Sequence, residues 1–360
     1  MNRKICALFL VVVCFVSFNK GYSQTSKKIF RKHTPNVDSN YVKPYEEDLT
    51  GRFFFSRKYT SLYIPGSGGA PKFEYKPNTT LNAGIGATFR SVSLNLAYGL
   101  PILNGDNSIK GKTKYLDLQG HFYARKFAFD FFGQFYRGYY ISPDNFVPGY
   151  PGYYYRPDLR LRVIGLSSYY IFNNRKFSYR ASMIQNERQT KSAGTILLGA
   201  EIYYGTVKSD STLVPSEIAE QYPEGIVNRT RFIKIGPGAG YAYTFVYKQH
   251  WFATASLTLN LPINFVRENI LAGGYKDNVD ISPNYTSRLA VGYNSRRWIY
   301  TASWVDNTIT MQGSFNDGIY RISTGNYRIT VAKRFTLDRK AKKILQPAAD
   351  IIDVPKKLTQ

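Results

Sequence analysis

The sequence is poor in the side chains that most enzymes and metal sites depend on. Its 360 residues include two cysteines and three histidines. Both cysteines, Cys6 and Cys14, fall in an N-terminal stretch that we expect to be removed on export, so the mature chain would lack thiols for a disulfide, a nucleophile or a metal site. The histidines are not spaced with carboxylates as zinc ligands are. We therefore predict no metal site and no cofactor.

Long apolar runs are also missing. The longest run, 5–18, is shorter than the roughly 18 residues that a membrane helix needs, which excludes a helical membrane protein. Arg3 and Lys4 precede this run, and the small residues Gly21 and Ser23 follow it. Basic residues, an apolar run and a small-residue cleavage site predict a secretory signal peptide over 1–23.

The chain is rich in aromatic residues, and its polarity alternates. Its 31 tyrosines and 24 phenylalanines are too many for a disordered protein. From Gly51 to Phe335, segments with alternating apolar and polar residues are separated by turn residues. In 251–261 the even positions are mostly polar, and the odd positions are Trp251, Ala253, Ala255, Leu257, Leu259 and Leu261. Successive side chains of a strand point to opposite faces, so this pattern predicts an all-β protein.

Connection lengths distinguish a β-sandwich from a transmembrane barrel. Short turns are predicted at 90–91, 125–126, 173–176, 248–250 and 294–297, and long connections at 65–77, 100–113, 142–157, 207–228, 267–284 and 312–324. Outer-membrane barrels have short periplasmic turns and long external loops. We therefore predict a transmembrane antiparallel β-barrel over 51–335, with a flexible periplasmic lead-in over 24–50 and a basic periplasmic tail over 336–360.

The strand number depends on how 177–206 is interpreted. Alternation gives thirteen strands when 177–187 is one of them, whereas a chain with both ends in the periplasm must cross an even number of times. Twelve strands result if 177–192 is not a full crossing, and fourteen if one strand has been overlooked. We prefer twelve.

Four stretches carry a family resemblance, namely 75–89 (YKPNTTLNAGIGATF), 114–122 (KYLDLQGHF), 187–194 (ERQTKSAG) and 236–241 (GPGAGY). Together they resemble a family of uncharacterised outer-membrane proteins of Gram-negative bacteria, known only as a domain of unknown function. The resemblance covers nearly the whole mature chain. It implies a barrel in the outer membrane and supplies no activity, substrate or catalytic residue.

Positive charge dominates the chain. It has 48 Lys and Arg residues against 24 Asp and Glu residues, a net charge of +24. A basic side chain on the lipid face at mid-bilayer costs about 2 to 4 kcal/mol, so most should face the lumen or lie at the rims. We expect the lumen residues to include Arg160, Arg162, Arg180, Arg188 and Lys234. Rings of Arg and Lys select anions, but the same residues could brace the lumen through Tyr and carboxylate partners.

Three other features have competing interpretations. The loop 139–157 presents Tyr150, Tyr153, Tyr154 and Tyr155 as candidate ligand contacts, because exposed Tyr rings offer rigid stacking area, although the loop could equally form a plug or an anchor. His121 shares a polar strand face with Asp117, and a lipid hydrolase would need a serine such as Ser93 within reach of His121. Such common residue types meet by chance on lumen faces, so a hydrogen-bonded lumen histidine is the simpler interpretation. The glycine-rich run 236–240 continues into a Tyr-rich strand, unlike a phosphate-binding loop.

These observations predict an outer-membrane barrel that acts as a passive pore or a small-ligand-binding barrel with a basic, anion-preferring lumen. Its expected partners are outer-membrane lipids and a small anionic solute. Nucleic acid is excluded because an exported chain lies outside the cytoplasm. We predict that the protein is not an enzyme. The alternatives are a lipid-modifying barrel enzyme and a structural or adhesive barrel whose long loops bind a surface partner.

Overall fold

The computed structural model describes residues 36–338, except 46, 67–68, 90–91, 101–105 and 316–317. The predicted signal peptide, 1–23, and most of the predicted tail, 336–360, lie outside the described residues. Within the described ranges, no helix is long and apolar enough to cross a membrane.

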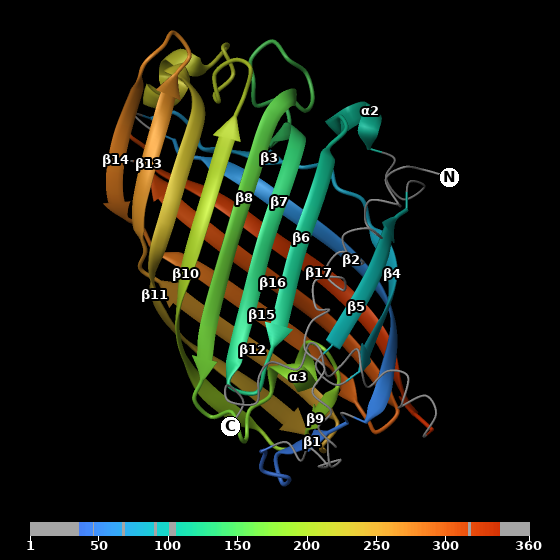
Figure 1. The fold of residues 1–360 in the computed structure, drawn as a ribbon. Helices are drawn as coiled ribbons and strands as arrows, with labels where there is room; N and C mark the ends of the chain where they lie inside the picture. The colour runs from blue at the N-terminus through green and yellow to red at the C-terminus, as the bar shows by residue number, and fades with distance from the viewer. Residues whose placement is uncertain are drawn as a thin grey trace, which may run out of the picture. The chain divides into compact units, whose positions relative to one another are not determined.

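Ten strands pair into a closed antiparallel barrel (Figure 1). In order around the ring they are β2 (Asp48–Ile64), β17 (Ile319–Thr336), β16 (Trp298–Gln312), β15 (Asn284–Asn294), β12 (Trp251–Asn260), β11 (Val227–Tyr247), β10 (Ala193–Lys208), β8 (Tyr155–Ile171), β7 (Phe127–Ser142) and β3 (Phe73–Lys76). Asp48 pairs with Thr336, so the chain enters and leaves the barrel at the same end. We call this the short-turn end and the opposite one the long-loop end.

Two crossings of the wall are interrupted by proline. The C-terminal half of β11 pairs with β12 and its N-terminal half with β13 (Ile263–Ile270), and Pro262 lies between these two partners. In the same way Pro283 separates β14 (Tyr275–Ile281) from β15. Proline has no N–H to donate, so each ladder breaks there. The predicted loop 267–284 is therefore wrong, because most of it forms the β13–β14 hairpin.

Three further strands complete the wall: β4 (Asn82–Phe89), β5 (Val92–Gly99) and β6 (Lys114–Tyr123). The short helix α2 (Asn107–Lys110) precedes β6. When β12–β13 and β14–β15 each count as one crossing, the described chain crosses twelve times, in β2, β4, β5, β6, β7, β8, β10, β11, β12–β13, β14–β15, β16 and β17. The preferred strand number and the all-β barrel are thus confirmed.

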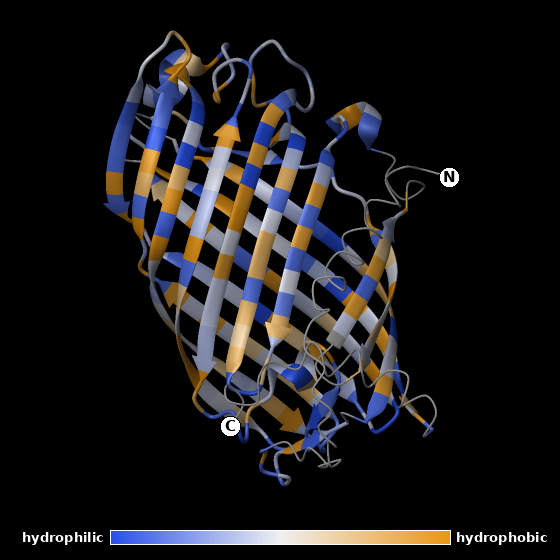
Figure 2. Ribbon diagram, viewed as in Figure 1, coloured by the Kyte–Doolittle hydropathy of each residue, from blue (hydrophilic) through white to orange (hydrophobic). Residues whose placement is uncertain are grey.

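The outward-facing side chains form an apolar band. Ile233 and Ile235 on β11 are about half exposed, as are Ile164 and Leu166 on β8. Their neighbours in sequence point inward, and Figure 2 shows the resulting alternation of apolar and polar residues along the strands. A closed barrel with an outward apolar band is the architecture of outer-membrane barrels.

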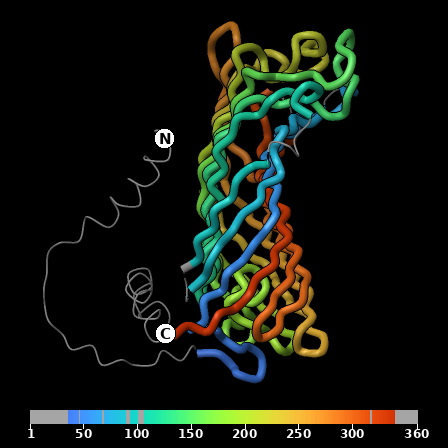
Figure 3. Tube along the Cα trace, turned by 90° about the vertical axis from the view of Figure 1, so that its right-hand side faces the viewer, coloured from blue at the N-terminus to red at the C-terminus, as the bar shows by residue number. Residues whose placement is uncertain are grey.

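Residues 172–192 fold into the short-turn end of the barrel and do not cross its wall (Figure 3). We call them the insert. It contains α3 (Tyr179–Ser182), all of which is buried, and β9 (Glu187–Gln189), which pairs with β1 (Val42–Pro44). This agrees with the preferred interpretation of the sequence, in which 177–192 is not a full crossing, and excludes the alternative of a barrel strand at 177–187. The expected flexible lead-in is wrong for the described residues from 36 to 50, because they include β1 and the start of β2.

Glu187 fastens the insert. Its carboxylate pairs with Arg125 and with Arg180 at 3.4 Å, and it accepts a hydrogen bond from Ser178 Oγ at 2.5 Å. Its backbone carbonyl accepts hydrogen bonds from Asn294 Nδ2 at 2.9 Å and Arg334 Nη2 at 3.0 Å. Burial alone would raise the pKa of Glu187, but Arg125 and Arg180 outweigh it and hold this pKa below its usual value. The charged carboxylate therefore stabilises the insert.

Glu187→Gln should release the insert, because removing one partner of a buried ion cluster costs about 3 to 5 kcal/mol. The pKa of Glu187 is lower in the folded state, so its contribution is complete above the unfolded value of roughly 4.3 and is lost as the pH falls further. Hydrogen exchange over 177–190 should therefore show acid-dependent opening in the wild type, and opening at every pH in the variant. The matched control is Glu217→Gln in an exposed loop, and identical exchange in both variants would contradict this role.

Candidate functional site

The lumen is closed at the long-loop end by the connection between β10 and β11. Leu213, Val214 and Ile218 of this connection are buried in an apolar cluster with Phe73 and Tyr320 from the barrel wall. The Tyr75 hydroxyl donates a hydrogen bond to the Leu213 carbonyl at 2.6 Å. The axis of the barrel is therefore occupied at this end by a folded loop and at the other end by the insert.

The middle of the lumen is polar and internally paired. Asp130 contacts Arg288 and lies 2.7 Å from His121 Nδ1. Lys234 Nζ donates to Asn284 Oδ1 at 2.6 Å, and Asn284 Nδ2 donates to Glu201 Oε1 at 2.5 Å. Arg288 and Lys234 are at most 1% exposed. These two cations are neutralised or solvated by the protein itself, as bracing residues would be.

The four other predicted lumen residues are not inward-facing residues of the barrel wall. Arg160 and Arg162 share the outward face of β8 with Ile164 and Leu166, so their predicted lumen position is wrong. The cost of charge on a lipid face vanishes near the rims, where these two arginines lie. Arg180 and Arg188 are buried in the insert, which folds into the barrel, and so they are not carried by a wall strand. Arg188 Nη1 lies 3.4 Å from His250 Nε2.

The four candidate tyrosines pack against nearby groups. Tyr150 stacks edge-on against Tyr154, whose hydroxyl lies 3.4 Å from Glu217, and Tyr153 packs on Tyr140. The Tyr155 hydroxyl donates to the Lys112 carbonyl at 2.7 Å. Tyr150 remains 44% exposed, so it offers more free ring surface than a fully packed tyrosine would.

His121 and Ser93 are not joined by any hydrogen bond among the described residues. His121 Nδ1 faces Asp130, while its Nε2 is buried and has no hydrogen-bond partner in the described part of the chain. Ser93 Oγ instead accepts hydrogen bonds from Arg52 Nη1 at 3.0 Å and Thr88 Oγ1 at 2.8 Å. The hydrolase constellation considered from the sequence is therefore not assembled.

The structure brings together two arginines that the sequence analysis did not select. Arg52 of β2 and Arg328 of β17 lie on the inward faces of two paired strands, where Arg328 is opposite Ser56, four residues from Arg52 along β2. The Arg328 guanidinium lies over the Phe54 ring at 4.4 Å. Within the described residues neither arginine has a carboxylate partner, and the Nε atom of each is buried without an acceptor. A cation without a counter-ion is costly to bury, and Arg52 is buried while Arg328 is half-buried, so the two arginines form a candidate anion site.

Arg52 lies behind a gap in strand pairing. In the described structure β5 pairs only with β4, and β6 pairs only with β7, so the facing edges of β5 and β6 are unpaired. We call this gap the seam. Arg52 Nη1 reaches Asn95 Oδ1 of β5 at 3.4 Å, and Arg52 Nη2 donates to the Ile184 carbonyl of the insert at 3.0 Å.

The seam lies within the apolar band, and side-chain contacts with β6 restrict it toward the long-loop end. Its outer flanks carry four exposed leucines, Leu94, Leu96, Leu116 and Leu118. Lys58 Nζ of β2 pairs with Asp117 Oδ1 of β6 at 3.3 Å, and the Tyr115 hydroxyl lies 2.9 Å from Thr80 Oγ1. Nearer the short-turn end, an apolar outer surface meets a basic inner surface at two unpaired strand edges. The alternation of polar and apolar residues places Arg52 on the polar face of its segment. The seam beside Arg52 cannot be found in this way, because it depends on which strands pair.

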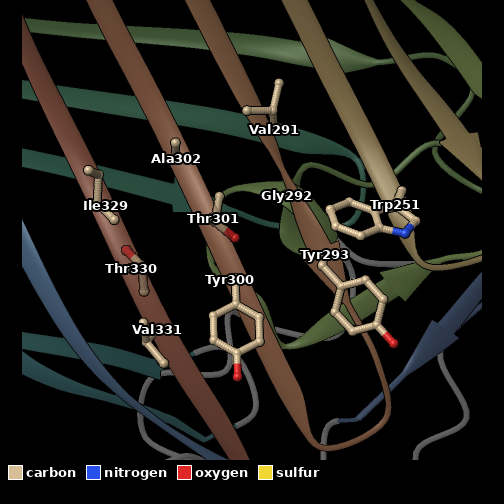
Figure 4. A pocket seen from close by; sticks show the side chains of 10 residues that line it. All are labelled: Trp251, Val291, Gly292, Tyr293, Tyr300, Thr301, Ala302, Ile329, Thr330 and Val331. Atoms are coloured by element: carbon tan, nitrogen blue, oxygen red, sulfur yellow. The ribbon is translucent and has the colours of Figure 1, made fainter.

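A shallow groove on the outer wall is lined mainly by aromatic and aliphatic residues and by no charged residue. Figure 4 shows its side chains, among them Trp251, Tyr293 and Tyr300, contributed by strands β12, β15, β16 and β17. These residues point outward near the short-turn end, where aromatic girdles of outer-membrane barrels lie. The groove is therefore part of the lipid-facing surface.

The chain belongs to the family described as domain of unknown function DUF4421, whose model matches residues 36–335. This confirms the predicted resemblance. No curated protein matches the sequence. Among solved structures, the outer membrane protease OmpT from Escherichia coli is 8% identical, covers 81% of this chain and 97% of its own, and gives a TM-score of 0.39. The translocator domain of the autotransporter NalP from Neisseria meningitidis is 8% identical, covers 92% and 95%, and gives a TM-score of 0.32.

The toluene transporter TodX of P. putida is also similar, with 7% identity, coverage of 81% and 91%, and a TM-score of 0.25. These likenesses are too distant to assign an activity. They do correct one prediction. Because a protease is among the matching barrels, this architecture gives no ground for excluding catalysis, and the prediction that the protein is not an enzyme is withdrawn.

Proposed function

We propose that this barrel binds an anionic amphiphile, which enters from the bilayer through the seam and places its charged group at Arg52 and Arg328. The observation that carries the proposal is the unpaired seam in the apolar band beside the buried Arg52, which, like Arg328 on the neighbouring strand β17, has no described carboxylate partner. The basic lumen expected from the sequence then acts through a single anion site.

The closed ends favour a binding barrel over a passive pore. Leu213 and Val214 fill the lumen at the long-loop end. At the short-turn end, the Tyr179 hydroxyl of the insert and Ser256 Oγ form a hydrogen bond of 2.6 Å. A solute moving along the barrel axis would have to displace both. Lateral entry needs neither displacement.

The chemistry of the seam suits an amphiphile. An unsatisfied backbone group in hydrocarbon costs several kcal/mol, so a seam left open in the bilayer favours an occupant that covers it. A guanidinium binds carboxylate or phosphate through two parallel hydrogen bonds, which fits the charged end of the molecule. The four exposed leucines at the seam offer apolar surface for its chain. Separation of the Lys58–Asp117 pair would widen the opening.

A planar-bilayer recording tests the closed axis. The wild-type barrel should show no steady conductance, because folded segments occupy both ends of the lumen. The same preparation must migrate differently in a detergent gel before and after boiling, which shows that the barrel is folded. A steady anion-selective current would contradict the proposal and favour the pore.

Binding of a long-chain fatty acid to the purified barrel in non-ionic detergent tests the anion site. Arg52→Gln and Arg328→Gln should each weaken binding roughly tenfold, because each loses charge-assisted hydrogen bonds. A fatty alcohol of equal chain length should bind equally to all variants. Arg57→Gln is the matched control, since Arg57 is on the exposed face of the same strand. Arg328 has no described hydrogen bond to the insert, so unchanged affinity in its folded variant would refute the site.

The ion pair between Lys58 of β2 and Asp117 of β6 predicts a kinetic effect. Lys58→Met removes this pair, so the fatty acid should associate and dissociate several-fold faster while the equilibrium affinity changes little. Stopped-flow fluorescence with a conjugated fatty acid measures both rates. Lys114→Met, in an exposed residue at the start of β6, is the control. Equal rates in wild type and Lys58→Met would argue against entry through the seam.

A further inference from the structure

Strand register places basic residues side by side on the outer wall near the long-loop end. Arg137 of β7 is opposite Arg160 of β8, Arg160 is opposite Lys208 of β10, and Lys208 is opposite Arg229 of β11. In the adjacent row Arg162 and Arg231 flank Thr206. We call these residues the basic belt: Arg137, Arg160, Arg162, Lys208, Arg229 and Arg231.

The basic belt borders the apolar band. On β8 the outward positions run from Leu166 and Ile164 to Arg162 and Arg160. On β11 they run from Ile235 and Ile233 to Arg231 and Arg229 in the same way. The change from apolar to basic side chains therefore occurs at a similar level on different strands, as it would where hydrocarbon gives way to headgroups.

The charge of this belt is poorly neutralised by the chain. Arg160 lies 4.0 Å from Asp210, whose side chain is 62% exposed. The side chains of Arg162, Lys208 and Arg229 have no ion pair or hydrogen bond with the described residues. The next strand provides a contrast, because Arg267, opposite Arg231, holds Asp277 through two hydrogen bonds of 2.7 Å. Like charges directly opposite each other on paired strands destabilise a sheet, and this belt has three such pairs in succession.

We propose that the basic belt binds the phosphate groups of lipids in the leaflet at the long-loop end. Lipids packed against Ile164 and Ile233 would present their headgroups at the height of Arg162 and Arg231. Neighbouring strands are about 4.8 Å apart, so the four-residue row spans roughly 14 Å, enough for more than one phosphate. Arginine recognises phosphate bidentately, and lysine adds a compact charge. This proposal requires neither the seam nor Arg52.

Lipid-dependent melting in neutral detergent tests the basic belt. Phosphatidic acid should raise the melting temperature of the wild type, and phosphatidylcholine should have little effect. The triple variant Arg160→Gln, Lys208→Gln and Arg229→Gln should lose the phosphatidic acid effect and bind this lipid at least tenfold more weakly by native mass spectrometry. The matched control, Lys248→Gln, Arg296→Gln and Arg297→Gln, removes the same charge from exposed turns at the other end and should behave as the wild type.

The lipid-free state separates binding from a structural role. Without phosphatidic acid the triple variant should melt at the wild-type temperature or above it, because like-charge repulsion has been removed. A lower melting temperature, or equal lipid loss in the control, would overturn the proposal. Inorganic phosphate should compete only at far higher concentration than the lipid, and competition at equal concentration would refute lipid as the occupant.

Discussion

The need to pair every backbone hydrogen-bonding group within the protein organises this barrel, because a bilayer offers no partners to exposed strand edges. Pairing of β2 with β17 and of β10 with β11 meets this need over most of the wall. The four-residue strand β3 closes the ring near the long-loop end, where it pairs with both β2 and β7. Nearer the short-turn end β5 and β6 leave two edges unpaired, and this exception is what gives the protein a candidate site.

Buried charged groups, like backbone groups, need partners within the protein. Asp130 pairs with Arg288, and Glu187 pairs with both Arg125 and Arg180, so these ion pairs hold the barrel and its insert together. Arg52 and Arg328 lack a carboxylate partner among the described residues, and in the basic belt Arg160 has only the exposed Asp210, at 4.0 Å. The two arginines face the lumen beside the seam and the basic belt borders the apolar band, so both sites are placed where an anionic lipid or lipid-like molecule could reach them. These are the two surfaces that we propose bind anions.

The errors of the sequence analysis have identifiable physical causes. Phe177, Tyr179, Ala181 and Met183 alternate as in a strand, yet they are packed inside the barrel, where tertiary contacts favour a helical turn. Arg160 and Arg162 have the same parity as Ile164 and Leu166, so their outward direction was present in the sequence. The energetic cost of charge on the lipid face was given more weight than this parity, although the cost becomes small near the rims.

By itself the sequence determined strands with one apolar face, the presence of short and long connections, and an excess of positive charge, but it left twelve and fourteen crossings open. The tertiary structure alone decided which strand edges remain unpaired, which cations meet a carboxylate and what fills the lumen. Asp130 and Arg288, for example, are far apart in the sequence and meet only because the sheet closes. Alternation fixes the face on which a side chain lies, whereas its partner across the lumen is set by closure and register, which are properties of the whole barrel.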